Sequence, residues 1–240
     1  MCVIYFAVDA HRELPLVLAA NRDEFYERPT AAAAIWDDAP DVFAGRDLAS
    51  GGTWLGVTTG GRFAAVTNYR DPSAPRGKLS RGMLTTDFLK SGEPPLDYLR
   101  HLASRPDDYS GYNLIVGAIR ERTEVGYYSD RGGEPRLLTP GIYGLSNHLL
   151  DTPWPKVLRG RARFAELIET GEIAPDAYLD ILADTATAPD ADLPSTGIPL
   201  EAERALSAIF IRTPGYGTRS SSLLTIGRDR RAILTEKVWV

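Results

Sequence analysis

The sequence predicts an α+β fold in which two antiparallel sheets lie together with helices outside them. Two features of the pattern support this prediction. Strand-like runs follow one another in neighbouring pairs, and the helical segments gather in two blocks instead of alternating with the strands. Regular alternation would indicate a parallel βαβ fold, whereas grouped strands and helices indicate a layered α+β domain. With 240 residues, of which 43% are hydrophobic, the chain can bury a large core without disulfides.

The chain opens with two strand pairs. Residues Cys2 to Val8 form a continuous apolar run rich in β-branched and aromatic side chains, which is typical of a strand covered on both faces. A second apolar run from Leu14 to Ala20 follows a polar turn, and the two runs together predict a hairpin. Further along, Gly60-Gly61 separates the strand-like runs Gly51 to Val57 and Arg62 to Thr67, which is a strong hairpin signal.

The remaining segments complete the sheets and the helices. Pro29 and the run Ala31 to Ala34 interrupt the strand pattern, and the Pro-, Asp- and Thr-rich stretch Thr185 to Pro199 is the expected loop. Helical segments are expected at Leu79 to Leu89, Leu96 to Leu102, Trp154 to Glu172 and Ala174 to Asp184. Further strands are expected at Tyr112 to Ala118, Glu124 to Tyr128, Gly141 to Asn147, Ala208 to Arg212, Ser221 to Ile226 and Ala232 to Leu234.

The composition argues against several classes of function. A net charge of −5 disfavours a nucleic-acid-binding domain, which normally carries a basic surplus. No apolar run approaches the length of a membrane span, and the first residues lack a secretory signal, so we expect no membrane insertion and a cytoplasmic location. A single cysteine permits neither an internal disulfide nor a cysteine-based zinc site. We therefore expect no metal and no cofactor, and the sequence carries no signal for an oligomeric state.

The one cysteine is Cys2, which directly follows the initiator Met1. Methionine is readily removed when the next residue is small, and its removal would leave a free α-amine and a thiol on the same residue. A thiol titrates near ~8.5 and an α-amine near ~7.7, so the amine can accept the thiol proton near neutral pH. Nucleophile and base then share one residue, as in N-terminal nucleophile hydrolases. A buried, inert cysteine is the competing interpretation.

Candidate partners for Cys2 follow the second predicted strand. Asn21-Arg22-Asp23-Glu24 lies where that strand ends, beside the start of the first. A carboxylate there can hold an α-ammonium, and Arg22 can lower the pKa of the thiol or bind a substrate carboxylate. Because side chains alternate along a strand, Asn21 and Asp23 are expected on one face and Arg22 and Glu24 on the other.

Other polar or aromatic residues are candidates for binding substrate or an oxyanion. Asn68 and Asn147 can supply oxyanion-hole amides, and Arg219 can supply a second contact to an anion. The remaining candidates for substrate contacts are Asn21, Trp54, Arg70 and His148. Asn at a strand end is commonly a turn residue and Trp is commonly a core residue, so a structural role is the alternative for these positions.

Several ordered motifs resemble the NRDE family, which is also called the transport and Golgi organisation protein 2 family. They extend from Cys2 to about residue 225, so the resemblance implies one domain over residues 1–240. The matching motifs are Met1-Cys2, Ala20 to Tyr26, Gly45-Arg46-Asp47, Gly51 to Gly56, Thr67 to Arg70, Gly144 to Asn147, Asp151 to Val157 and Arg219 to Ser222.

The family is similar to N-terminal nucleophile hydrolases of the penicillin V acylase and bile-salt hydrolase type, so the resemblance implies a four-layer αββα sandwich. It also implies Cys2 as the nucleophile, a carboxylate of the Asn21 to Glu24 motif near the amine, Asn147 in the oxyanion hole and Arg219 as a supporting cation. In those hydrolases the early Arg and Asp are separated by two residues, whereas Arg22 and Asp23 are adjacent. Either Asp23 or Glu24 can therefore be the carboxylate, and either Asn21 or Arg22 can occupy the Arg position.

Two functions follow as expectations. The first is hydrolysis of a linear amide C–N bond through a Cys2 thioester after removal of Met1. The second is binding and trafficking of haem or of an acyl lipid or acyl-CoA without turnover, since members of the family have been linked to haem and acyl-lipid handling. The expected ligand is thus a small-molecule amide, an acyl compound or haem.

Overall fold

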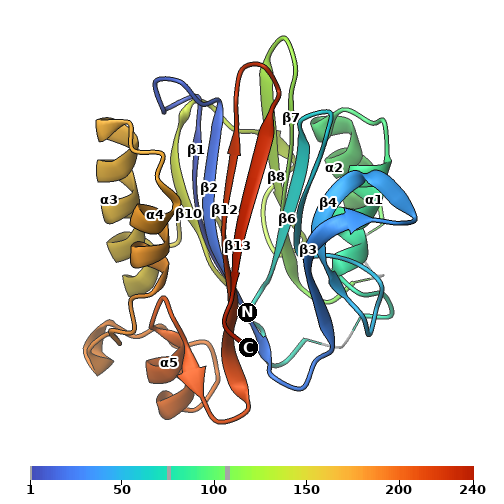
Figure 1. Cartoon of the computed structure of the whole chain (residues 1–240). Coiled ribbons are helices and arrows are strands. Elements are labelled where there is room, and N and C mark those ends of the chain that lie inside the picture. Colours follow the sequence, from blue (N-terminus) through green and yellow to red (C-terminus); the bar gives the residue numbers. More distant parts are fainter. Residues whose placement is uncertain (1, 75–76, 106–108) are drawn as a thin grey trace.

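Two antiparallel sheets stack face to face in the computed structural model, which describes residues 2–74, 77–105 and 109–240 (Figure 1). The first sheet has the order β10 (Gly141–Leu145), β1 (Cys2–Val8), β2 (Leu16–Phe25), β12 (Tyr216–Ile226) and β11 (Arg212–Thr213), and β13 (Ala232–Val238) also pairs with β12. The second has the order β3 (Thr30–Trp36), β4 (Ala39–Asp47), β5 (Leu55–Thr58), β6 (Arg62–Asn68), β7 (Tyr112–Ile119), β8 (Thr123–Ser129) and β9 (Arg136–Leu137).

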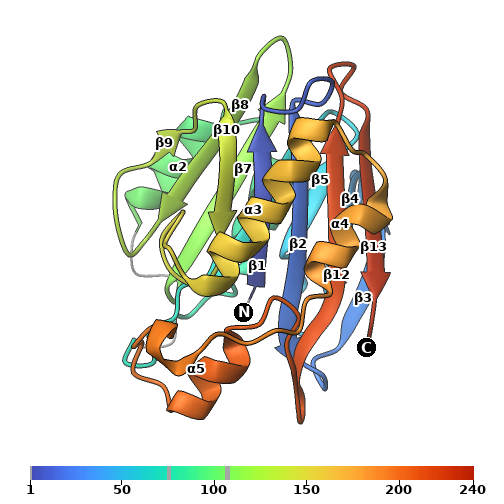
Figure 2. The same cartoon turned by 90° about the vertical axis from the view of Figure 1, so that its left-hand side faces the viewer.

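Helices cover the outer face of each sheet. Helices α1 (Gly82–Lys90) and α2 (Pro95–Ala103) pack on the second sheet, and α3 (Pro155–Thr170) and α4 (Pro175–Leu182) pack on the first (Figure 2). Helix α5 (Leu200–Leu206) follows a loop that contains a short 3-10 turn at Asp190–Asp192. The layers are therefore helix, sheet, sheet, helix, which confirms the predicted αββα sandwich.

The apolar run at the start of the chain is explained by its position between two layers. All seven residues of β1 are buried. Ile4 and Phe6 point into the core between the sheets, whereas Val3 and Tyr5 point into the core under α3 and α4. A strand covered on both faces needs apolar side chains at every position, so the strand shows no alternation of apolar and polar residues.

Helix α3 packs unusually close to β1. A Cβ atom added to Gly160 would lie 2.1 Å from the ring of Tyr5, so only glycine allows this approach. The Tyr5 hydroxyl donates a hydrogen bond of 2.8 Å to the backbone oxygen of Lys156 and fixes the first turn of the helix. Lys156, Gly160, Phe164 and Ile168 are all buried and form one stripe at four-residue spacing.

The first sheet is longer at one end than the sequence predicts. Strand β2 does not stop at Ala20 but continues to Phe25, so Asn21 to Glu24 lies inside the strand. The run Ala31 to Ala34, expected to interrupt the strand pattern, forms part of β3. Strand β3 is at the edge of its sheet, and all its residues except Trp36 are half-buried or exposed, so it lacks the apolar signal on which the prediction depends.

The predicted strand at Ala208 to Arg212 is wrong. Most of this segment is irregular although Ile209 and Ile211 are fully buried. Its backbone has no regular ladder but several separate partners: Asn21 Nδ2 donates to the oxygen of Ile209, and the Phe210 N–H donates to the backbone oxygen of Asp184. The Ile211 N–H donates to Thr218 Oγ1, and the Thr218 N–H donates to the oxygen of Ile211. A short buried apolar run has the same pattern in a strand and in a covered loop.

Among the described residues, no helix combines the length and the apolar character that crossing a membrane requires. Met1, whose removal is part of the expected mechanism, lies outside the described residues.

Candidate active site at the start of strand β1

A cleft of about 490 Å³ opens between the sheets where β1 begins. The ends of β2, β4 and β6 and the loop before α1 line it. Cys2 lies in its wall and is 7% exposed. The loop at Gly52 approaches α1 so closely that an added Cβ would lie 2.5 Å from the backbone of Gly82. The cleft thus places one thiol and many charged side chains around one space, and its uncharged polar and aromatic lining includes Thr53, Trp54 and Asn68.

The motif after Ala20 divides between two faces of β2, as alternation predicts. Arg22 is the cross-strand partner of Cys2, lies on the same face, and lines the cleft with Glu24. Its Nη1 has no hydrogen-bond partner among the described residues. Asp23 is 1% exposed, and its Oδ1 accepts a hydrogen bond of 2.7 Å from Thr218 Oγ1 on β12. A register shift in β12 between Thr218 and Ser220 makes Thr218 the cross-strand partner of Asp23. Asp23 also lines the cleft.

Burial raises the pKa of the Cys2 thiol above its ordinary value. The Asp23 carboxylate raises this pKa further, while the backbone N–H of Asp23 and the Arg22 guanidinium lower it. Asp23 is therefore the carboxylate of the motif whose charge acts on the thiol. Burial also raises the pKa of Asp23 itself, against the opposing effects of Lys156, Thr218 and Arg22.

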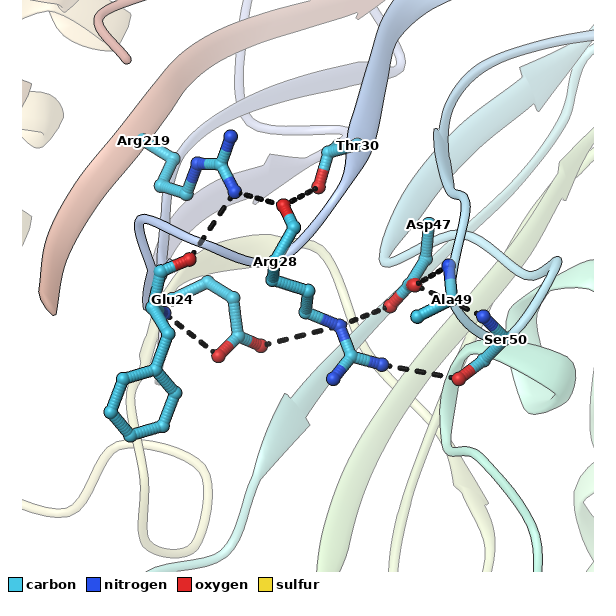
Figure 3. A network of polar contacts seen from close by, with 8 residues as sticks. Glu24, Arg28, Thr30, Asp47, Ala49, Ser50 and Arg219 are labelled. Atoms are coloured by element: carbon cyan, nitrogen blue, oxygen red, sulfur yellow. Dashed lines mark hydrogen bonds and ion pairs between the residues drawn. The ribbon is translucent and has the colours of Figure 1, made fainter. Parts of the chain in front are cut away.

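Glu24 belongs to a separate network on the cleft wall. Its Oε2 lies 4.0 Å from Arg28 Nε, and the same Nε lies 2.6 Å from Asp47 Oδ2 (Figure 3). The other oxygen of Asp47 accepts hydrogen bonds from the backbone N–H groups of Ala49 and Ser50. Asp47 belongs to the Gly45-Arg46-Asp47 motif. Through Arg28 it connects the turn after β2 to the turn after β4.

Arg219 does not line the cleft but supports the same turn. Its Nη1 donates to the backbone oxygens of Phe25 and Arg28 (Figure 3). Its Nε and Nη2 donate to the backbone oxygen of Val240. Burial lowers the pKa of Arg219. Its contacts in the structure are thus with backbone carbonyls behind the cleft.

Asn147 lies behind Asn68 instead of facing the cleft. Its Nδ2 donates a hydrogen bond of 3.0 Å to the backbone oxygen of Asn68, and its Oδ1 accepts one from Ser146. The Ser146 hydroxyl also donates to the backbone oxygen of Cys2. These contacts connect the end of β10 to the starts of β1 and of the loop after β6. The side chain of Asn68 itself reaches the cleft.

Asn21 occupies the helix side of the first sheet. It is fully buried, its Nδ2 donates to the backbone oxygens of Leu182 and Ile209, and its Oδ1 accepts from Ser221 Oγ at 2.6 Å. All the hydrogen-bonding groups of this amide are directed away from the cleft. The structure thus places Asn21 in the packing of the sheet against its helices.

Arg70 and His148 form a second polar group beside Trp154. Arg70 pairs with Glu203 at 2.5 Å, with both side chains at most 6% exposed, and its guanidinium lies over the Trp154 ring. His148 Nε2 lies 2.8 Å from the Tyr69 hydroxyl, and burial lowers the pKa of this histidine. Neither side chain lines the cleft described above.

Comparisons with known proteins agree with the motifs. The family model described as Transport and Golgi organisation 2 matches residues 1–240. The chain belongs to the Transport and Golgi organisation 2 family. It is similar to a Transport and Golgi organization protein 2 homolog of Bos taurus, at 38% identity over 99% of this chain and 92% of the relative. A relative named Transport and Golgi organization protein 2 from Drosophila melanogaster is 28% identical over the same shares.

Solved structures show which fold this family member shares. A Caenorhabditis elegans N-acylethanolamine-hydrolyzing acid amidase ortholog superposes with a TM-score of 0.56 at 10% identity, over 100% of both chains. The mutant C2A conjugated bile acid hydrolase from Clostridium perfringens superposes with a TM-score of 0.52 at 7% identity, over 100% of this chain and 97% of that chain. At such low identity the likeness concerns the fold, which is that of N-terminal nucleophile hydrolases.

The sequence did not single out several basic residues in or near the cleft of this family member, among which are Lys78, Arg81 and Lys156. Lys78 and Arg81, in the loop before α1, line the cleft, and Arg81 Nη1 donates to the backbone oxygen of Gly111. Lys156 is 1% exposed, and the Asp23 carboxylate opposes the lowering of its pKa by burial. Its position on the stripe shared with Gly160, Phe164 and Ile168 was a usable signal, since a lysine at an apolar helix position is unusual.

Within the described residues, no group of three or more His, Cys, Asp or Glu is arranged to hold a metal ion.

Proposed function

We propose that this protein is a cysteine N-terminal nucleophile hydrolase that cleaves a linear amide C–N bond through a thioester on Cys2 once Met1 is removed. The position of Cys2 carries the proposal. It begins β1, it lines a cleft of about 490 Å³, and it does so in a fold shared with an acid amidase ortholog and a bile acid hydrolase. A thiol at that position becomes the side chain of an N-terminal residue when Met1 leaves.

The reaction needs no group beyond Cys2 to move protons. The α-amine takes the thiol proton, and the thiolate attacks the amide carbonyl to form a tetrahedral oxyanion. The C–N bond then breaks, and the leaving amine takes the proton from the α-ammonium. Water, deprotonated by the α-amine, attacks the resulting thioester, which releases the carboxylic acid and restores the thiol.

The residues around Cys2 have roles that match this sequence of steps. Arg22, on the same face as Cys2, favours the thiolate electrostatically. Asp23, buried next to the thiol, orients the α-ammonium. Asn68 is available to an oxyanion from the cleft wall. Asn147 joins the oxyanion hole only by exchanging its hydrogen bond to Asn68 for one to the substrate.

Hydrolysis of a panel of amides by the mature protein tests the proposal. The panel includes N-acylethanolamines and conjugated bile acids, because the two structural neighbours are named for them. We expect turnover by the wild type and a loss of at least about 100-fold for a form whose amine is blocked by an uncleaved N-terminal extension, because the amine is the general base. Cys2→Ala should show no turnover. Equal activity in the blocked form would contradict the mechanism.

One observation favours ligand binding without turnover as a second candidate. The Cys2 thiol is buried and its pKa is raised, which disfavours the reactive thiolate. The cleft then binds haem or an acyl-CoA without forming a covalent bond. Saturable binding in an absorbance titration with haem, or in a thermal shift with acyl-CoA, would favour this candidate if it survives Cys2→Ala and no amide is hydrolysed.

A further inference from the structure

A second hollow, a groove of about 560 Å³, lies between the turn that joins β7 to β8 and the turn that joins β12 to β13. Both turns lie at the same end of the sheets (Figure 1, Figure 2). Strand β12 runs from the Cys2 cleft to this groove: Gly217 pairs with Glu24 of the cleft wall, and the groove begins two residues after Ile226. The groove is lined by Arg120, Glu121, Arg122, Glu124, Arg228 and Arg230.

The charge of the groove differs from that of the whole chain. Four arginines and two glutamates line it, which gives a local charge of +2 on a chain whose net charge is −5. Among the residues that the structure describes, none of the four guanidinium groups forms an ion pair or a hydrogen bond. By contrast, Arg159 and Arg161 each lie 2.8 Å from an aspartate oxygen. The guanidinium groups of the groove are thus free to bind an anion.

The backbone holds the two turns in place. The Arg230 N–H donates a hydrogen bond of 2.9 Å to the backbone oxygen of Gly227, which closes the turn after β12. Gly61, in the turn between β5 and β6, packs between this turn and the end of β7: a Cβ added to it would lie 3.0 Å from the oxygen of Ile119 and 3.4 Å from Arg230 Cβ. The arginines therefore extend from fixed positions, and a ligand has only their side chains to order.

Arg230 has a strained backbone. Its φ of 67° lies in the left-handed region, which glycine adopts readily and residues with a Cβ adopt at a cost. Glycine at this position would therefore favour folding more than arginine does. Strain of this kind is typical of functional positions. Because no described residue bonds the Arg230 guanidinium, the strain has no counterpart in a contact that stabilises the fold.

We propose that this groove is a binding site for a small ligand with more than one phosphate group. Arginine matches phosphate in a bidentate geometry, and the three terminal oxygens of a phosphate can bind more than one guanidinium. The two glutamates in the lining disfavour a weakly charged anion, which is why several phosphates fit better than one. The volume is in the range of small-molecule sites. A soluble polyphosphate and a phosphorylated lipid headgroup share this chemistry.

Two binding measurements test the proposal. One is calorimetric titration with tripolyphosphate, and the other is cosedimentation with phosphatidylcholine vesicles that contain phosphatidylinositol phosphate. We expect saturable binding by the wild type, and Arg120→Met combined with Arg230→Met, which removes one guanidinium from each turn, should weaken it by at least about tenfold.

Arg100→Met combined with Arg163→Met is the matched control, since it removes the same charge from exposed positions on α2 and α3. Its affinity should stay within about twofold of the wild type. Binding of tripolyphosphate would support a soluble ligand, and binding confined to the vesicles would support a lipid headgroup. Binding of neither probe, or an equal loss in the control, would overturn the proposal.

Arg230→Gly separates binding from folding. It should raise the melting temperature by about 2 °C, because it relieves the left-handed strain, and still weaken probe binding by at least about threefold. A lower melting temperature or an unchanged affinity would contradict the assignment of Arg230 to the site. None of these measurements involves Cys2 or an amide, so their outcome is independent of the proposed function.

Discussion

At the scale of single residues, the site depends on how one strand distributes adjacent side chains. Arg22 and Asp23 are neighbours in the chain, yet Arg22 lines the cleft next to Cys2 whereas the Asp23 carboxylate is held from β12 by Thr218. The alternation was predictable from the sequence. Which carboxylate acts on the thiol was not, because that depends on the register shift in β12, some 195 residues away in the chain.

Arg22→Met should slow alkylation of Cys2 by iodoacetamide at pH 8. Arg22 lowers the pKa of the thiol, so its loss reduces the thiolate fraction, and we expect a decrease of roughly threefold to tenfold. Rates measured from pH 6 to 10 should show the profile moved to higher pH. Arg28→Met is the matched control, because Arg28 also lines the cleft but pairs with Asp47. Identical profiles for the wild type and Arg22→Met would contradict the assignment.

At the scale of elements, the sequence predicts best where each element has its own apolar pattern. Strand β1 and both helix pairs were found close to their predicted bounds, whereas β2 continues five residues beyond its predicted end. Strand β3 was not expected, since an exposed edge strand of alanines has little β signal, and Ala208 to Arg212 was mistaken for a strand because its burial comes from tertiary contacts. The sequence also did not indicate that Lys156 is buried near other charges, because the charged groups that act on it belong to β2 and α5 and not to its own helix.

Gly160→Ala should destabilise the protein, because the added methyl group would collide with Tyr5 at 2.1 Å. We expect the free energy of unfolding in urea to fall by about 2 kcal/mol, the usual cost of overpacking a core. Gly92→Ala is the control: nothing lies within 4 Å of an added Cβ there, so its effect should stay within about 0.5 kcal/mol. A stabilised Gly160→Ala would mean that α3 does not approach β1 as closely as described.

At the scale of the whole molecule, the two helix layers have different relations to the site. Helix α1 forms part of the wall of the cleft together with the loop that precedes it, while α3 packs on the first sheet and carries the buried Lys156. The fold also buries several charged groups, including Asp23, Lys156, Arg70 and Glu203. Such groups make stability depend on pH in a way that exposed ion pairs do not.

Stability should rise with pH between about 8 and 10.5 as a result of Lys156. Its pKa is about 8 in the folded chain and near 10.5 when unfolded, so in this range the unfolded chain binds the extra proton and folding is favoured as pH rises. The contribution has a ceiling of about 3 kcal/mol. Subtracting the curve of Lys156→Met, measured by urea unfolding at each pH, removes the effects of buried tyrosines. A difference that does not change with pH would refute the assignment.

Intact mass spectrometry after incubation with a small acyl donor, quenched in acid, tests the central claim about Cys2 most directly. The account predicts a protein that lacks Met1 and carries one added acyl group, which peptide mapping places on Cys2 and which is absent from Cys2→Ala. Complete retention of Met1, or a mature protein that stays unmodified while it hydrolyses the donor, would contradict it.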